Sequence, residues 1–312
     1  MAIYWDEKVF LLGIESAYGT APTLTAADAI LATNIRLQPM EGQDVSRNLE
    51  RPHMGAQPTI PVDVISRLAF TAEILPSGDA GVPPVIGKLL RICGCAQVIV
   101  PDTSVAYSPV SRGHESGAIH LWIGDTRYAL IGTRGTGTVR IAASGIPVVD
   151  FDLTGLFVMP TEATPVLPDL DDQLEAEVLV ATTANTPVFS IDEVPLVMRS
   201  FSLAFGNQVE PRFLIGSERV LITGRSEVIE TTVEALPLTA LNPFALAMAR
   251  TRVPVVAKHG TDAGNTVTVS APLSQMQRPA GLEEQQGIKE WPLRLVPQAT
   301  SAGNDQWTIA FT

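Results

Sequence analysis

Apolar and polar side chains alternate along several stretches of this chain. Between residues 59 and 75, every second side chain from Leu68 to Ile74 is apolar, and the side chains between them are mainly polar. Successive side chains of a β-strand point to opposite faces, so this pattern predicts a long strand with one face towards a core and one towards water. Residues 228–234 alternate in the same way and predict a second strand of this kind.

These two strands belong to a repeat. The stretch RPHMGAQPTIPVDVISRLAFTAEI, which begins at Arg51, aligns without a gap with RFLIGSERVLITGRSEVIETTVEA, which begins at Arg212 (212 − 51 = 161). The identical positions are Arg51 and Arg212, Gly55 and Gly216, Thr71 and Thr232, and Glu73 and Glu234. A repeat at a fixed offset indicates a tandem duplication. We therefore predict a mainly β protein with two tandem domains, residues 1–167 and residues 168–312, the second beginning with a linker.

Each half also contains one predicted short helix. Residues 85–93 and 242–250 have apolar side chains at helical spacing, and Asn242 followed by Pro243 is typical of a helix start. Further strands follow each helix. We expect residues 293–295 to repeat residues 139–141, and residues 307–311 to repeat residues 151–155.

A long polar segment separates the first strands. Residues 39–58 are mixed in charge, and a loop of about 20 residues between paired strands is usually functional or disordered. Two interpretations stay open: a flexible surface loop, or an arm that becomes ordered by docking on a neighbouring subunit. Its charged side chains are Glu41, Asp44, Arg47, Glu50 and Arg51. The equivalent loop of the second half, residues 206–216, is shorter.

The bulk composition excludes several classes of protein. With 46% hydrophobic and 17% charged residues, the chain of 312 residues is expected to fold rather than to be disordered. A net charge of −12 without a basic run argues against a protein that binds nucleic acid through phosphate contacts. No apolar stretch is typical of a signal peptide or a membrane span, so we expect synthesis and retention in the cytoplasm, without a membrane partner.

Candidate chemistry is sparse. Cys93 and Cys95 are expected to be buried free thiols at the end of a helix, because the four histidines are scattered without metal-ligand spacing. The glycine-rich residues 132–137 lie between two predicted strands without a following helix, so we interpret them as a hairpin turn rather than a nucleotide site. The acidic residues 169–172 lack the spacing of an EF-hand, which leaves only weak calcium binding open. We therefore expect no catalytic residues, no metal, no cofactor and no enzymatic activity.

The remaining expectation is structural. A duplicated sheet domain has edge strands with unpaired backbone N–H and C=O groups, which can pair with other chains. Copies of the chain can pair all of these edges with one another by closing into a ring. The hydroxyl and acidic side chains on the polar strand faces would then line a lumen. We name Thr71, Glu73, Glu230, Thr232 and Glu234 as the candidate lumen residues.

A series of short motifs extends this picture. The chain resembles the major tail tube proteins of siphoviruses, in particular the two-domain family of Mu-like siphophages of Pseudomonas and related bacteria. The motifs that carry the resemblance are residues 15–20 (ESAYGT), 22–30 (PTLTAADAI), 39–42 (PMEG), 51–55 (RPHMG), 84–94 (PVIGKLLRICG), 103–111 (TSVAYSPVS), 206–209 (GNQV), 216–218 (GSE), 221–223 (LIT), 259–265 (HGTDAGN) and 292–295 (PLRL). Their specificity lies in their order and number, because none is a catalytic signature.

The resemblance implies a fold and a function. Each domain would be a β-sandwich with one short helix, and its sheets would join those of other subunits in a closed β-barrel. Rings of three two-domain chains, with pseudo-sixfold symmetry, would stack into the hollow tail tube of a virion after assembly in the host cytoplasm. The long loop at residues 39–58 would reach the next ring. The implied partners are other copies, the tape-measure protein, the tail terminator and distal tail proteins, and double-stranded DNA that passes through the lumen without specific binding.

Two alternatives come from other classes of protein. One is a carbohydrate- or receptor-binding β-sandwich of a tail fibre or adhesin, which the low aromatic content of 6% disfavours. The other is a tube component of a secretion or contractile injection system, which would share the ring fold.

Overall fold

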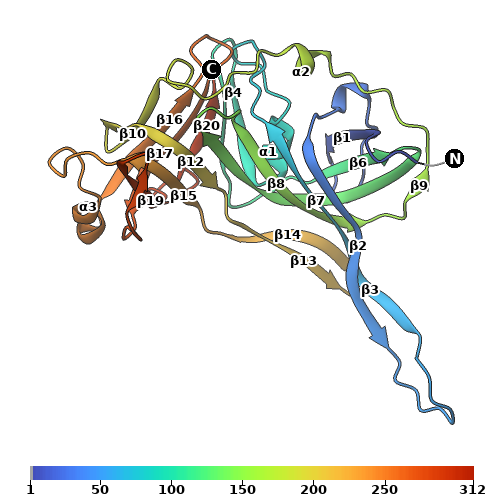
Figure 1. Cartoon of the computed structure of the whole chain (residues 1–312). Helices are drawn as coiled ribbons and strands as arrows, with labels where there is room; N and C mark the ends of the chain where they lie inside the picture. The colour runs from blue at the N-terminus through green and yellow to red at the C-terminus, as the bar shows by residue number, and fades with distance from the viewer. Residues whose placement is uncertain (1–2) are drawn as a thin grey trace.

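The computed structural model describes residues 3–312 and is mainly β, which confirms the predicted fold class at this level (Figure 1). The α-helices among these residues are short: α1 (Gly87–Ile92), α2 (Asp171–Glu175) and α3 (Pro243–Ala249). The predicted capping of the third helix is confirmed, since the Asn242 side chain accepts a hydrogen bond from the Ala245 backbone N–H at 3.0 Å.

The strands of the described residues pair in antiparallel fashion. In the first half they are β1 (Lys8–Ile14), β2 (Thr33–Ser46), β3 (Thr59–Glu73), β4 (Cys95–Val100), β5 (Ser104–Pro109), β6 (Gly117–Ile123), β7 (Thr126–Ala142), β8 (Val148–Phe157) and β9 (Thr161–Glu162). In the second half they are β10 (Val188–Ile191), β11 (Val194–Pro195), β12 (Met198–Ala204), β13 (Asn207–Leu214), β14 (Ser217–Arg225), β15 (Val228–Glu234), β16 (Arg252–His259), β17 (Val267–Met276), β18 (Glu283–Gln285), β19 (Ile288–Pro297) and β20 (Thr308–Phe311).

One sheet runs through both halves of the chain. Its strands pair in the order β2–β3–β8–β7–β12–β15–β19, and we call it the spanning sheet. The two halves meet where β7 pairs with β12, with Val139 opposite Leu203 and Arg140 opposite Ser202. Backbone hydrogen bonds from Phe205 N to Gly137 O (2.9 Å) and from Ala143 N to Arg199 O (2.8 Å) flank this junction.

A second layer covers the apolar face of the spanning sheet. β4, β5, β20, β17, β16 and β10 pair in this order, so the C-terminal strand β20 lies between β17 of its own half and β5 of the first half. β1 pairs with β6, which pairs with the first part of β7. A single cluster of buried apolar side chains connects the layers and extends through both halves.

The strand pairs of the described residues form an open, branched network rather than a closed barrel. Over residues 3–312, no series of strand pairs returns to its starting strand. The outer edge of β2 lies at one end of the spanning sheet, and β18 together with the end of β17 lies at the other. Within the described part of a single chain, the spanning sheet is therefore open, with one free edge at β2 and one at β18.

Two expectations about local structure are wrong. Residues 39–46 belong to β2 and not to a loop, because β2 continues to Ser46 in antiparallel pairing with β3. The glycine-rich residues 132–137 lie within β7 rather than at a hairpin turn. Gly135 is required there for close packing, since a Cβ atom would lie 2.2 Å from Leu153 Cδ2.

The expected correspondence of the last strands is also wrong. Leu293 and Leu295 pair with β15 in the way that Phe151 and Leu153 pair with β3, so β19 corresponds to β8 and not to β7. The segment at residues 307–311 contains β20, which pairs with β17 and β5 instead of joining the spanning sheet.

One aromatic pair of the second half lies at the junction, where Phe205 closely approaches Gly137 of β7. Phe205, which follows β12, is fully buried and stacks on Trp307 with ring centroids 4.6 Å apart. Phe205→Ala is expected to lower the free energy of unfolding by about 3–5 kcal/mol, because it removes a buried aromatic side chain and leaves a cavity.

Urea-induced unfolding measures this change. Phe244→Ala is the matched control, since Phe244 lies on α3 with 43% of its surface exposed and should change stability by no more than about 0.5 kcal/mol. Equal effects of the two substitutions would contradict the assigned role of Phe205.

Candidate functional site

All five candidate lumen residues lie on one face of the spanning sheet. Thr71 and Glu73 come from β3, and Glu230, Thr232 and Glu234 come from β15. The alternate side chains of both strands are buried, as the sequence pattern predicts. Register connects the two groups across the junction between the halves: Thr71 is opposite Asp150, Asp150 is opposite Thr138, and Ser202 is opposite both Arg140 and Glu230.

This polar face contains basic as well as acidic side chains. Arg140 forms an ion pair with Asp150 at 2.5 Å, and the Thr71 hydroxyl donates to the same carboxylate at 2.7 Å. Arg294 lies 3.7 Å from Glu230. The face is therefore a surface of paired charges and hydroxyls rather than the mainly acidic wall that the sequence alone suggested.

Sequence reasoning missed the contributions of β7, β8 and β19 to this face. Asp150 and Asp152 alternate with buried Val149, Phe151 and Leu153, so the same strand pattern was present in the sequence. What the pattern lacked was the pairing partner, because alternation reveals the faces of a strand but not its neighbour in the sheet.

One ion pair of this face joins a buried carboxylate, Glu290, to a half-exposed arginine, Arg199. The Arg199 Nε atom donates to both carboxylate oxygens of Glu290, at 2.9 and 2.7 Å, and Glu290 is only 2% exposed. These hydrogen bonds lower the pKa of Glu290 and raise the pKa of Arg199. Glu234 is directly opposite Glu290 on the neighbouring strand, so Arg199 offsets an excess of negative charge.

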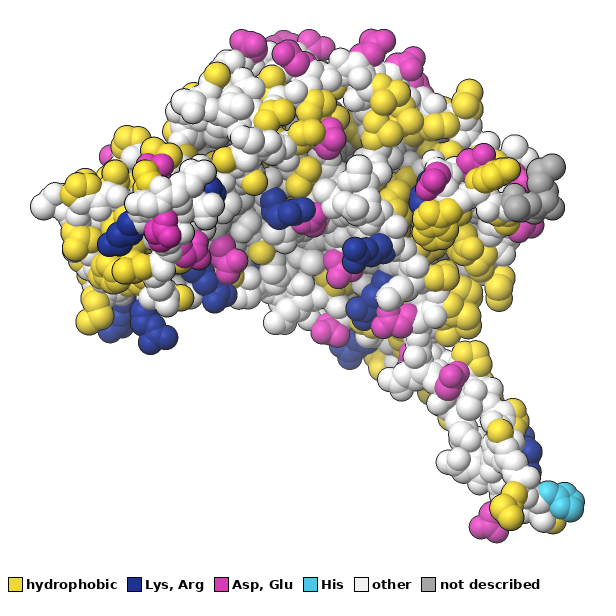
Figure 2. Space-filling model, viewed as in Figure 1, with side chains coloured by type: hydrophobic (Ala, Val, Ile, Leu, Met, Phe, Trp, Pro, Cys, Tyr) yellow, Lys and Arg dark blue, Asp and Glu magenta, His cyan; other side chains and the backbone are white. Residues whose placement is uncertain are grey.

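The second candidate feature is an arm that projects from the body (Figures 1 and 2). Its stem is the hairpin of β2 and β3, and its tip is residues 47–58. Glu41 and Asp44 lie in the stem, where Glu41 forms an ion pair with Arg67 at 3.0 Å. The tip contains Arg47, Glu50 and Arg51, and all three are exposed to solvent. Exposed apolar side chains, including Met54 and Leu49, accompany them.

The second half has a corresponding but shorter hairpin, β13–β14, which packs against the body. The Val220 backbone donates a hydrogen bond to the Tyr18 hydroxyl at 2.6 Å, and Arg134 Nη1 donates to the Val220 carbonyl at 2.8 Å. Arg225 donates to the Gly94 and Val110 carbonyls at 3.0 and 3.2 Å. The first hairpin has no such contacts along its tip among residues 3–312, so only the first hairpin is available as an arm.

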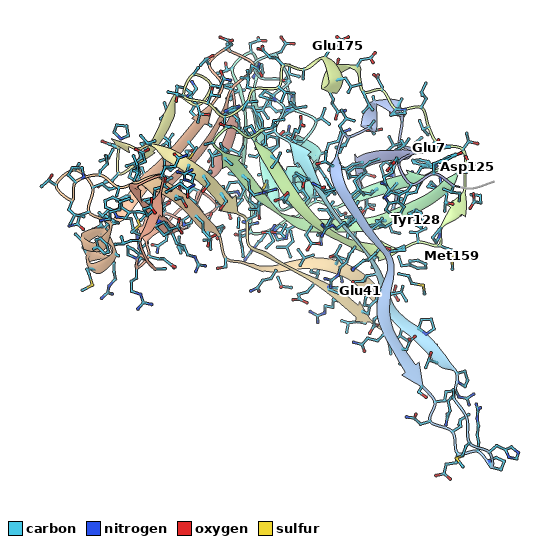
Figure 3. The ribbon with its side chains drawn as sticks, viewed as in Figure 1. Glu7, Glu41, Asp125, Tyr128, Met159 and Glu175 are labelled. Carbon is cyan, nitrogen blue, oxygen red and sulfur yellow. The ribbon has the colours of Figure 1, made fainter. Side chains whose placement is uncertain are left out.

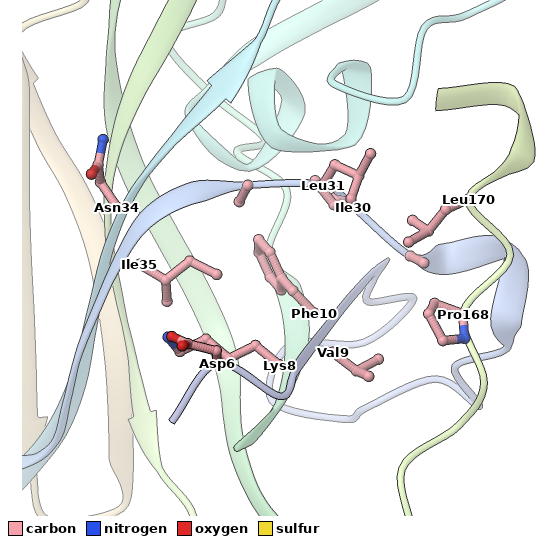
Figure 4. A pocket seen from close by; sticks show the side chains of 12 residues that line it. Asp6, Lys8, Val9, Phe10, Ile30, Leu31, Asn34, Ile35, Pro168 and Leu170 are labelled. Carbon is pink, nitrogen blue, oxygen red and sulfur yellow. The ribbon is translucent and has the colours of Figure 1, made fainter. Parts of the chain in front are cut away.

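A surface hollow of about 270 Å³ lies between β1, β2 and the linker (Figure 4). It is lined mainly by apolar side chains, and its charged residues are Asp6 and Lys8. Figure 3 shows Glu7, Asp125 and Tyr128 near the outer end of the first half, away from the arm stem at Glu41.

The two cysteines are inert in this environment. Cys93 and Cys95 are free and buried, as expected, and burial raises the pKa of the Cys95 thiol to about 12. The part of the chain that the structure describes contains no group of three or more residues suited to hold a metal ion. Within the same part, no helix is long and apolar enough to cross a membrane.

Comparisons with known proteins assign no family. No protein-family model matches the chain, and a search of curated proteins gives no match either.

The ion pair of Arg199 and Glu290 predicts a pH-dependent contribution to stability. Arg199 lowers the folded-state pKa of Glu290, so the pair stabilises the fold above about pH 4.5, the ordinary value of a glutamate, and this contribution is lost as the pH falls through the lowered pKa. Arg199→Gln should therefore lower the melting temperature clearly at pH 7 and much less at pH 3.5.

Arg294→Gln is the control for this prediction. Both Arg294 and Glu230 are more than half exposed, so their pair is screened by solvent and its loss should change the melting temperature little at either pH. A pH-independent effect of Arg199→Gln would show that Glu290 does not depend on this partner.

Proposed function

We propose that this chain is the repeating subunit of a hollow tube, the major tail tube of a siphovirus. The observation that supports this proposal most directly is the spanning sheet. It crosses both halves of the chain, buries one face, exposes a polar face and ends in two free edges among the described residues. A sheet of this kind satisfies its edges by pairing with further copies of itself.

The strand pairing of the two halves supports a tandem duplication. In the first half, β3 lies between β2 and β8, and β8 pairs with β7. In the second half, β15 lies between β12 and β19, and β19 pairs with β18. β3 and β15 are also the strands that the sequence repeat aligns. Two tandem tail-tube domains, residues 1–167 and 168–312, account for this arrangement.

Closure by three copies gives a tube of suitable width. Each chain supplies eight strand positions, those of the spanning sheet and β18, so three chains supply 24 (3 × 8). Strands about 4.8 Å apart and tilted by about 40° then give a circumference of roughly 150 Å, which corresponds to a diameter of roughly 48 Å. Such a barrel leaves room for DNA after its side chains are placed.

The polar face would then line the lumen. Two of its arginines are engaged with carboxylates, in the pairs Arg140–Asp150 and Arg294–Glu230, which reduces the positive charge available to phosphates. Because phosphate neutralisation is what holds DNA on a protein, a wall of paired charges favours passage over binding. The candidate lumen residues Thr71, Glu73, Glu230, Thr232 and Glu234 belong to this face.

The projecting arm would connect one ring to the next. It extends beyond the body, and its tip has both charged and apolar exposed side chains, as a docking segment requires (Figure 2). In this proposal the tape-measure protein fills the tube before DNA does, and the tail terminator and distal tail proteins close its ends. The protein would act in the virion after assembly in the host cytoplasm.

Deletion of the arm tip separates ring formation from stacking. Replacing residues 48–57 by two glycines should leave rings intact, because the spanning sheet is unchanged, but should shorten or abolish tubes. Negative-stain electron microscopy of the purified protein, beside the unaltered chain, measures both states. Tubes of normal length from the deletion variant would show that the arm does not join rings.

Reversal of charge in the lumen should slow DNA. Phage assembled with Glu230→Lys and Glu234→Lys is expected to form normal tails but to eject DNA several-fold more slowly, since lysines on the wall would contact phosphates. Glu175→Lys with Glu177→Lys, two exposed positions of the linker, is the matched control. Unchanged ejection kinetics in the first variant would contradict the lumen assignment.

A further inference from the structure

We propose that the spanning sheet continues from one copy of the chain to the next in a defined register. In this register β2 lies antiparallel to the chain that enters β18 of a second copy, and Arg36 faces the partner's Glu283. This inference rests on the proposed function, but it adds the residues of the contact and is tested separately.

The junction inside the chain provides the template. β7 and β12 are paired there with Arg140 opposite Ser202 and Val139 opposite Leu203. If the two halves are repeats, the edge that corresponds to β12 should pair with the edge that corresponds to β7. The two free edges of the spanning sheet correspond in this way.

The first free edge takes the place of β12. On β12, Ser202 is opposite Glu230 and Leu203 is opposite Ile229. On β2, Arg36 is opposite Ala69 and Leu37 is opposite Leu68. Ala69 and Leu68 precede Glu230 and Ile229 by the repeat offset of 161 (230 − 69 and 229 − 68). Arg36 therefore occupies the position of Ser202, and Leu37 that of Leu203.

The second free edge takes the place of β7. Arg140 is opposite Val148, which is opposite Glu73 on β3. Glu283 is opposite Glu290, which is opposite Glu234 on β15. Because Glu73 and Glu234 are repeat equivalents, Glu283 occupies the position of Arg140. The template pair of Ser202 and Arg140 thus becomes Arg36 and the partner's Glu283.

Charge favours this register. Three carboxylates, from Glu234, Glu290 and Glu283, lie side by side on neighbouring strands, and Arg199 forms an ion pair with one of them, Glu290. Like charges directly opposite each other destabilise a sheet. Arg36 is exposed and has no carboxylate within 4 Å among residues 3–312. A second copy would bring this unpaired cation to the edge that has excess negative charge.

Apolar contacts favour it as well. In an antiparallel pair, the residue after Arg36 faces the residue before Glu283, which places Leu37 against the partner's Leu282. This pair repeats the contact between Leu203 and Val139 inside the chain. Leu282 is 60% exposed in a single chain, and the neighbouring β2 would cover it.

Cysteine cross-linking tests the register directly. Side chains directly opposite each other on paired strands have Cβ atoms about 4.5–5.5 Å apart, within reach of a short thiol cross-linker. Arg36→Cys with Glu283→Cys in one chain should convert most assembled protein into covalent multimers on a denaturing gel. Arg36→Cys with Glu284→Cys is the matched control, because adjacent side chains of a strand point to opposite faces. The control should cross-link at least about tenfold less.

Charge reversal gives a second readout. Arg36→Glu and Glu283→Arg alone should each raise the concentration needed for assembly by about tenfold or more, because each places like charges in contact. The two substitutions together should restore assembly to within about threefold of the unaltered chain.

The outcomes separate the two proposals. Normal rings that do not cross-link through residues 36 and 283, or that cross-link equally through residue 284, overturn the register while the tube function stands. Unaltered protein that forms no rings under any condition overturns the proposed function and this register with it. Selective cross-linking with charge rescue supports both.

Discussion

Backbone pairing between β7 and β12 is the interaction on which this structure depends. It turns two short sheets into one, and it aligns the polar faces of both halves on the same side. A shift of β12 by one residue along β7 would move the side chains of β12 to the opposite face of the sheet. Phe201 and Leu203, which are buried, would then face water. The stack of Phe205 on Trp307 and the position of β20 between β17 and β5 secure the same register from the second layer.

The spanning sheet that this pairing creates has free edges at β2 and β18. An edge strand exposes unpaired backbone groups, and proteins usually protect such edges by shortening, charging or covering them. Here β2 is long, and β18, at the opposite edge of the spanning sheet, lies in an acidic environment. A head-to-tail contact between two different edges of the same chain generates a ring when its rotation closes. In the proposed tube, this asymmetry would account for both the order of subunits and the protection of edges.

Local structure was predictable where one face of an element is buried. The alternation in β3 and β15, the cap at Asn242 and the buried state of Cys93 and Cys95 could all be read from the sequence because burial or capping leaves a local signal. The stem of the arm left no such signal, because both faces of the hairpin meet water beyond Gln38. The glycines of β7 indicated a turn, whereas the structure uses Gly135 and Gly137 for close approach to Leu153 and Phe205.

The candidate site was predictable only in part for a related reason. The sequence identified Thr71, Glu73, Glu230, Thr232 and Glu234 as members of polar strand faces. It did not reveal that β8 and β7 lie beside them with Asp150 and Arg140, because pairing between strands that are distant in sequence depends on the whole core. The balance of charge on the face therefore emerged only with the register.

The mass of the assembled ring tests the central claim most directly. Purified protein at high concentration should form rings or tubes in electron micrographs, and native mass measurement of single rings should give three chains of 33.3 kDa, about 100 kDa (3 × 33.3). Rings of six chains would keep a tube but contradict the closure of duplicated halves in threes. A species of 33.3 kDa that persists at every concentration, with or without preformed tube ends, would contradict the account of the spanning sheet as a self-pairing surface.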